Sequence, residues 1–361
     1  MTTLKEIAKH RLSSQQIVAT KFITAQDIVN WMGAMQAQDF AMAKLAVGIR
    51  VPNSTEETID TALNKGEILR THLLRPTWHF VSADDIYWLL ELTASQIKIK
   101  LRSSDNRLNL SEKIFTKSNA IIEKAFEFQK EFTREELKTK LKEASIPTDE
   151  NRLSHLLLHA ELDGIICSGS VTENRQSYVI LSERIPKKKI FTRDEALAEL
   201  AKKYFTSRSP ATLQDFIWWS GLSTTAARQA LESVKSYFVS EKINSEIYWF
   251  IDSVVLPPKK EITINLLPSF DEYIISYKDR TAVLPPEHFH RTVTANGIFW
   301  PVILLNGQVI GKWKRMSKKD KVFIEIELFQ PQNKTARRQI ERAANEIGEF
   351  LNKETVITCY L

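Results

Sequence analysis

Glycine is scarce in this chain, which has only 10 glycines among its 361 residues. Folds that bind dinucleotides or nucleoside triphosphates through a glycine-rich loop need glycine where the backbone meets a phosphate. The sequence has neither a Gly-x-Gly-x-x-Gly nor a Gly-x-x-x-x-Gly-Lys pattern, and it lacks the Gly-x-Ser-x-Gly elbow of serine hydrolases. These absences count against nucleotide-binding folds and serine hydrolases.

Cysteine is rare, and long apolar runs are absent. Cys167 and Cys359 lie far apart, so we expect two buried, reduced thiols rather than a disulfide framework or a thiolate zinc site. His155 and His159 are four positions apart on a predicted helix, but only leucines separate them, so we expect packing residues and no metal. No apolar run reaches the ~18 residues of a membrane-spanning helix. Because the N-terminal segment also lacks a signal-peptide pattern, we expect a cytoplasmic protein that binds no membrane.

Positive charge is in mild excess, with 50 Lys and Arg residues against 44 Asp and Glu residues. A net charge of +6 permits a polyanionic partner without requiring one. The basic clusters are Lys187, Lys188 and Lys189; Lys312, Lys314, Arg315, Lys318, Lys319 and Lys321; and Arg337 with Arg338. Each cluster alone is typical of a solvated surface, but together they favour a surface that binds phosphates.

The first 256 residues repeat one order of elements, in which helices precede a short hairpin. Thr24, Thr133 and Thr192 each have the pattern of a helix N-cap followed by an acidic residue three positions later. The predicted hairpins span residues 68–81, 165–181 and 238–251. Helix, helix and hairpin is the winged-helix order. The predicted winged-helix domains are residues 1–100, 101–185 and 186–256.

After Pro257 and Pro258 the pattern becomes rich in strands. The predicted strands span residues 262–266, 299–305, 308–313, 322–329 and 356–360, and a predicted amphipathic helix spans residues 335–352. Asn306-Gly307 is a strong hairpin turn between two of these strands. We therefore predict a C-terminal β-rich domain over residues 257–361 and an α+β fold for the whole chain.

Two pairs of neighbouring residues invite a functional interpretation. Asp271 and Glu272 are adjacent, but adjacent residues on a strand point to opposite faces, so we do not expect paired catalytic carboxylates. Trp218 and Trp219 lie on a predicted helix and point in two directions. We expect one indole in the core, and the other is either an ordinary surface residue or a platform on which a base stacks.

A short motif after the first amphipathic helix carries the strongest functional signal. Gln36 and Gln38 flank Ala37, and residues separated by one position point to the same side of an extended segment. Alone, the pair indicates no more than two surface amides. The segments that accompany it are RTHLLRPTWHFV at 70–81, LLPSFDEY at 266–273 with Tyr277, Asp279 and Arg280, and GKWKR at 311–315.

Together these segments resemble the winged-helix DNA glycosylase family of AlkZ/YcaQ-like proteins, and the resemblance runs from about Thr24 to Trp313. It implies tandem winged-helix motifs in a C-shape around a DNA duplex, with a barrel-like C-terminal part. It also implies monofunctional cleavage of the N-glycosidic bond of alkylated purines, in some members within interstrand crosslinks. The family's catalytic motif is Gln-x-Gln or Gln-x-Asp, which here corresponds to Gln36 and Gln38.

The chemistry of such a reaction suits a pair of carboxamides. A purine alkylated at N3 or N7 carries positive charge, so it is already a good leaving group and needs little acid catalysis. The enzyme must place a water below the sugar carbon and stabilise charge locally. A glutamine amide has an acceptor oxygen and two donor hydrogens, which are enough to orient that water. Because an amide is a poor base, turnover of an undamaged purine should be negligible.

Double-stranded, damaged DNA is the expected partner of a monomer that needs no cofactor and works at the nucleoid. The expected phosphate contacts are Lys187, Lys188, Lys189, Lys312, Lys314 and Arg315. Arg75, His79 and the hairpin tip at 169–176 are expected to reach DNA, although His79 has an alternative role in a hydrogen bond to its neighbouring strand. Pro76 stands where the resemblance leads us to expect glycine, and it stiffens the turn beside Arg75. The rival hypothesis is a non-catalytic DNA-binding protein or transcription regulator.

Overall fold

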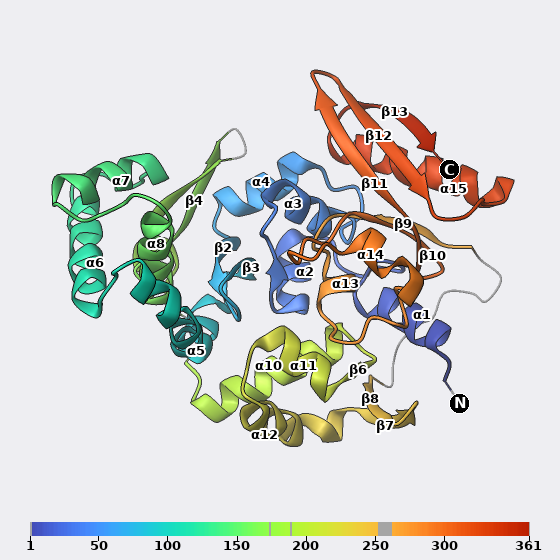
Figure 1. The fold of residues 1–361 in the computed structure, drawn as a ribbon, viewed down its shortest axis with the longest axis horizontal. Coiled ribbons are helices and arrows are strands. Elements are labelled where there is room, and N and C mark those ends of the chain that lie inside the picture. Colours follow the sequence, from blue (N-terminus) through green and yellow to red (C-terminus); the bar gives the residue numbers. More distant parts are fainter. Residues whose placement is uncertain (1, 173–174, 188–189, 252–261, 361) are drawn as a thin grey trace.

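The computed structural model describes residues 2–172, 175–187, 190–251 and 262–360, and it has the mixed α+β architecture that the sequence predicts (Figure 1). Lys188 and Lys189 lie outside the described residues. None of the described helices is both long enough and apolar enough to cross a bilayer.

The first unit holds the glutamine motif between helices and a small sheet. Its elements are α1 (Leu4–Ser14), α2 (Ala25–Met32), β1 (Met35–Gln36), α3 (Phe40–Gly48), α4 (Glu56–Asn64), β2 (Ile68–Leu73) and β3 (Thr77–Ser82). The side chain of Thr24 accepts a hydrogen bond from Asp27 N, which caps α2 as predicted. In the sheet order β1-β3-β2, the short strand β1 lies at the edge and pairs Gln36 with His79.

The second unit also ends in a hairpin. Its elements are α5 (Ile86–Arg107), α6 (Glu112–Phe126), α7 (Arg134–Glu143), α8 (Arg152–Leu162), β4 (Ile166–Thr172), β5 (Arg175–Ile180) and the short α9 (Leu181–Arg184). Thr133 and Glu136 form the predicted capping box at the start of α7. In Figure 1 this unit is the green part, and the hairpin β4–β5 extends from it beside α4.

The third unit repeats the helix-then-hairpin order. Its elements are α10 (Arg193–Ser207), β6 (Ala211–Thr212), α11 (Leu213–Ser220), α12 (Thr224–Val234), the turn η1 (Lys235–Tyr237), β7 (Val239–Ile243) and β8 (Glu246–Phe250). Gly221 adopts a left-handed φ of 69° at the C-cap of α11, where a glycine ends the helix at little conformational cost.

The C-terminal part is an open sheet with helices, and not the barrel-like structure that we expected. Its elements are β9 (Ile264–Leu267), α13 (Glu272–Ile275), η2 (Pro286–His288), α14 (Phe289–Thr292), β10 (Val302–Leu305), β11 (Gln308–Lys318), β12 (Lys321–Leu328), α15 (Lys334–Phe350) and β13 (Glu354–Tyr360). Among the described residues the sheet has the order β13-β12-β11-β10-β9, and its edge strands β9 and β13 do not pair with each other. The barrel-like part that the resemblance implied is therefore wrong, because the described strands pair into a sheet whose two edges stay open.

The hydrophobic core joins parts of the chain that are distant in sequence. Buried residues of α2, α3 and β3 pack with those of β11, β12 and α15 in one cluster. Gly48 permits a close approach, because a Cβ atom there would lie 2.3 Å from the Phe350 ring. A second cluster joins α5 to α10, α11 and α12. Hydrogen bonds from Gln36 to Glu272 and from Arg208 to Ala34 place the glutamine motif where the first, third and C-terminal parts meet.

Candidate functional site

Gln36 and Gln38 lie on an extended segment at the edge of the first sheet. Burial alternates along this segment, since Met35 and Ala37 are buried, Gln36 is half-buried and Gln38 is exposed. Ala37 N donates to Trp78 O over 2.7 Å, which continues the pairing of β1 with β3 beyond Gln36. This alternation agrees with the expectation that the two carboxamides point to the same side of the segment.

Two long-range contacts hold Gln36. Its backbone N–H donates to Oε1 of Glu272 over 2.7 Å, and its side-chain Oε1 accepts a hydrogen bond of 3.1 Å from Nη2 of Arg75. The first contact fixes the backbone, and the second fixes the carboxamide. Both partners come from segments that accompany the glutamine motif in the sequence.

Glu272 is the centre of a buried ionic network. Its Oε2 accepts hydrogen bonds from Arg208 Nη2 at 2.6 Å, from Trp219 Nε1 at 3.0 Å and from Ser276 Oγ. Burial alone would raise the pKa of Glu272, but the charge of Arg208 and the hydrogen bonds from its neighbours lower that pKa to about 2. The carboxylate is therefore ionised at neutral pH.

The same network secures the chain just before Gln36. Arg208 donates to the carbonyl oxygens of Met32 at 2.7 Å and Ala34 at 2.8 Å. Because Glu272 binds both Arg208 and Gln36 N, one ion pair fixes the backbone from the end of α2 to β1.

The expectation that Asp271 and Glu272 lie on a strand is wrong. Asp271 is the N-cap of α13, and its carboxylate accepts two hydrogen bonds of 2.8 Å from the buried Arg50. Each of the adjacent carboxylates thus has its own buried arginine, so neither is a free acid or base. Sequence reasoning missed the partners because they come from elements far away in the chain.

A different group of residues holds Gln38. Arg70 Nε donates to Ala37 O over 3.0 Å, and its Nη2 lies 3.5 Å from Gln38 O. Trp78 N lies 3.4 Å from Gln38 Oε1, and the Arg70 guanidinium lies 4.3 Å from the centre of a Trp78 ring. Arg70 Nη1 also donates to Gln176 Oε1 on β5 over 3.0 Å, which joins the motif to the hairpin of the second unit.

His79 is fully buried, so in this structure it has no surface to offer to DNA. Its Nδ1 lies 2.9 Å from Thr77 O, and its Nε2 has no hydrogen-bond partner among the described residues. Burial and the nearby charge of Arg75 lower the pKa of His79 to about 3, so the ring is neutral at physiological pH. The contact of Nδ1 with Thr77 O lies within β3 itself, so it differs from the expected alternative of a hydrogen bond to the neighbouring strand.

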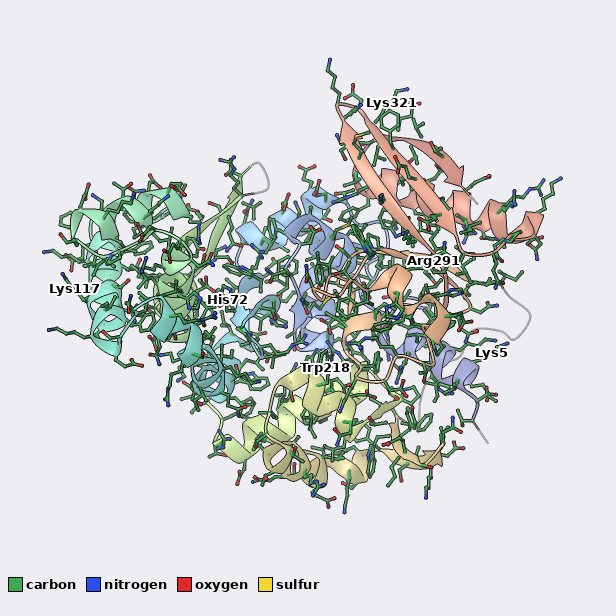
Figure 2. The ribbon with its side chains drawn as sticks, in the orientation of Figure 1. Lys5, His72, Lys117, Trp218, Arg291 and Lys321 are labelled. Atoms are coloured by element: carbon green, nitrogen blue, oxygen red, sulfur yellow. The ribbon has the colours of Figure 1, made fainter. Side chains whose placement is uncertain are left out.

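Arg75, which donates to Gln36, lies beside Trp218. Trp219 is fully buried, whereas Trp218 is 41% exposed and donates from Nε1 to Ile275 O over 3.0 Å. The Arg75 guanidinium lies 5.8 Å from the centre of the Trp218 ring. Figure 2 shows Trp218 at the junction of the third unit with the orange C-terminal segment. The expectation of one core indole and one surface indole is confirmed.

The basic residues on β11 lie on opposite faces of the strand. Lys312 and Lys314 share one face, where Lys312 Nζ lies 3.1 Å from Glu327 Oε2. Arg315 lies on the other face and is half-buried; burial lowers its pKa, whereas the charges of Glu56 and Asp39 raise it. Arg315 is thus within electrostatic range of Asp39, which follows Gln38.

Two other predictions concern residues outside this site. Lys187 is exposed and forms an ion pair with Glu91. His155 and His159 both contact the carboxylate of Asp105, through Oδ1 and Oδ2 respectively. No group of His, Cys, Asp and Glu within the described ranges could hold a metal ion. The two histidines are packing residues, as the sequence indicated.

Comparisons with known proteins agree with this arrangement. The chain is 23% identical over 330 residues to a protein of Streptomyces sahachiroi named interstrand DNA cross-link repair glycosylase, and the match covers 86% of this chain and 87% of the relative. The solved structure of the Streptomyces sahachiroi DNA glycosylase AlkZ superposes with a TM-score of 0.81 at 19% identity, covering 99% of this chain and all of that one. The family model described as DNA glycosylase AlkZ-like matches residues 29–350. The expected family is thereby confirmed, and this chain belongs to the AlkZ-like DNA glycosylases.

Proposed function

We propose that this chain is a monofunctional DNA glycosylase that hydrolyses the N-glycosidic bond of cationic, alkylated purines in duplex DNA. The observation that carries the proposal is the pair Gln36 and Gln38, which lie on one edge segment and are held by separate sets of contacts. The Streptomyces relative is named for interstrand cross-link repair. We therefore include alkylated purines within interstrand crosslinks among the substrates.

Hydrolysis on this site needs a positioned water and no covalent intermediate. The water oxygen forms a bond to the sugar C1′ as the bond from C1′ to the purine nitrogen breaks. The bonding electron pair moves onto the purine and neutralises its positive charge, and the water releases one proton to solvent. Gln36 and Gln38 orient the water by hydrogen bonding, since an amide neither accepts a proton fully nor forms a Schiff base.

The rest of the chain would hold the DNA around this site. We propose that the helix-and-hairpin units are winged-helix modules within the predicted domains 1–100, 101–185 and 186–256, arranged in a C-shape around the duplex. The proposed phosphate contacts are Lys187, Lys188, Lys189, Lys312, Lys314, Arg315 and the tip of hairpin β4–β5. We also propose that the protein acts as a monomer on nucleoid DNA in the cytoplasm.

The test is direct. A duplex with one N7-methylguanine is incubated with the protein, and heat or alkali then converts abasic sites into strand breaks. We expect breaks at the lesion with wild-type protein and none with Gln38→Ala, which should still bind the duplex. Binding to a preferred operator sequence without cleavage would instead identify a regulator.

A further inference from the structure

We propose that Arg75 is a positioning residue that fixes the orientation of the Gln36 carboxamide. This inference rests on the proposed function, because it concerns the same site. It replaces the expectation that Arg75 reaches DNA with a role directed inwards, at the side chain of Gln36.

The contact between the two side chains defines which end of the amide faces Arg75. A guanidinium can only donate hydrogen bonds, so the atom that lies 3.1 Å from Arg75 Nη2 must be the carboxamide oxygen of Gln36. The amide NH₂ group then points away from Arg75. A charged donor makes a stronger hydrogen bond than a neutral one, so this orientation is the preferred one of the two.

The surroundings of Arg75 hold it in this position. The adjacent Leu74 has a left-handed φ of 59°, and the next residue is Pro76, so the turn has little freedom. The turn that contains Gly221 packs against it, because a Cβ atom at Gly221 would lie 2.7 Å from Leu74 O and 3.4 Å from Arg75 Cγ. Trp218 covers another side of the guanidinium. The third unit thus packs against the turn that carries Arg75 and restricts its movement.

Arg75 as a whole is half-buried, and its buried Nε edge argues against a phosphate contact at that edge. Arg75 Nε is buried and has no hydrogen-bond partner among the described residues, so it offers no open edge on that side. Burial lowers the pKa of Arg75, while the Glu272 carboxylate raises it and Arg208 lowers it. By contrast, Lys314 is exposed on β11, as a side chain that binds phosphate should be.

The fixed Gln36 amide gives the two glutamines different hydrogen-bonding roles. Gln36 presents its N–H donors to the site, because Arg75 engages its oxygen. Gln38 receives a long contact of 3.4 Å at its own oxygen from Trp78 N, so that oxygen is better able to accept a hydrogen bond from the attacking water. Loss of Arg75 would let the Gln36 amide rotate and weaken this arrangement.

Arg280 offers a matched control. Its guanidinium lies 5.3 Å from the centre of the same Trp218 ring, but it donates to the backbone oxygens of Ile274 and Lys278. Within the part of the chain that the structure describes, it makes no hydrogen bond to Gln36. Arg280→Ala therefore removes a comparable charge beside Trp218 while leaving the amide contact intact.

The experiment compares Arg75→Ala, Arg75→Lys and Arg280→Ala with wild type. Single-turnover rate constants are measured on a duplex with one N7-methylguanine, and affinity is measured over a range of salt concentrations on a duplex with a stable abasic-site analogue. Arg75→Ala should lower the rate constant about 10- to 100-fold while affinity and its salt dependence stay unchanged. Arg75→Lys should recover part of the rate, and Arg280→Ala should stay within a few-fold of wild type.

The results that would contradict the role of Arg75 differ from those that would contradict the proposed function. A rate constant for Arg75→Ala equal to that of wild type overturns the inference, as does an equal loss in Arg280→Ala. Arg75→Ala could instead bind DNA more weakly, with a slope of log affinity against log salt reduced by about one, while its rate constant in the saturated complex stays unchanged. That result identifies Arg75 as a phosphate contact. If thermal melting shows that Arg75→Ala does not fold, Arg75→Gln replaces it with the same expected and contrary results. A wild-type protein that leaves the lesion intact refutes the proposed function itself.

Discussion

The backbone N–H of Gln36 donates a hydrogen bond of 2.7 Å to Oε1 of Glu272, which follows it by 236 positions in the chain. Glu272 is in turn held by Arg208, so the segment that carries Gln36 is held by a buried ion pair between the third unit and the C-terminal part. The position of Gln36 therefore depends on assembly of the whole molecule and not on the first unit alone.

Replacement of Glu272 should be strongly destabilising. Glu272→Gln keeps the size of the side chain but leaves the fully buried Arg208 without a counter-charge. Breaking such a pair costs about 3–5 kcal/mol, which urea unfolding would measure. Glu327→Gln is a control, because Glu327 pairs with Lys312 and Arg291 at the surface, where an ion pair contributes about 1 kcal/mol or less. Equal decreases in unfolding free energy in Glu272→Gln and Glu327→Gln would contradict a stabilising role for the buried network.

His79 should make stability depend on pH. Its pKa is about 3 in the folded protein against an ordinary 6.5, so between these values the unfolded chain binds a proton that the folded chain does not. Stability from this residue is therefore lost as pH falls through that window, by at most about 1.4 kcal/mol per pH unit. Urea unfolding at about pH 7 and about pH 5 should show a smaller decrease for His79→Gln than for wild type. An identical decrease would show that His79 is not held neutral.

Adding an atom at the contact between α3 and α15 should lower the stability of the protein. Gly48→Ala places a methyl group against Phe350, and overpacking of this kind costs about 1–3 kcal/mol. When Phe350→Leu is combined with Gly48→Ala, the decreases in unfolding free energy should be non-additive, because Phe350→Leu opens space next to residue 48. Strictly additive losses in denaturant unfolding would argue against direct packing of the first unit on the C-terminal helix.

Lys314 should contribute to DNA binding without sequence preference. Lys314→Ala should weaken binding to any duplex and reduce the slope of log affinity against log salt by about one. Lys5 on α1 is an exposed control that lies far from β11 in Figure 2, and its replacement by Ala should change the slope much less. If both variants have the wild-type slope, the phosphate contacts lie elsewhere.

Local patterns in the sequence predict much of the secondary structure. The Thr133 and Glu136 capping box, the hairpin at residues 68–81 and the strands around Asn306-Gly307 all follow from short-range chemistry. The glutamine motif is different, because Gln36 and Gln38 alone indicate only two surface amides, and the motif is recognised only together with the distant segments that accompany it.

Contacts between distant segments could not be predicted in this way. Nothing near Glu272 in the sequence indicates that it pairs with Arg208 or binds Gln36, and a helix of four residues is too short to have a clear periodicity. His79 lies in the predicted hairpin, but its burial depends on which elements cover the sheet. The open edge of the C-terminal sheet is likewise a property of the assembled strands.

The most direct test of the account is formation of abasic sites in a duplex with one N7-methylguanine by wild type, Gln36→Ala and Gln38→Ala. We predict strand breaks at the lesion with wild type after heat or alkali, and loss of breaks in both variants while duplex binding is retained. Wild-type levels of breaks in both variants would contradict the assignment of these two carboxamides as the catalytic pair.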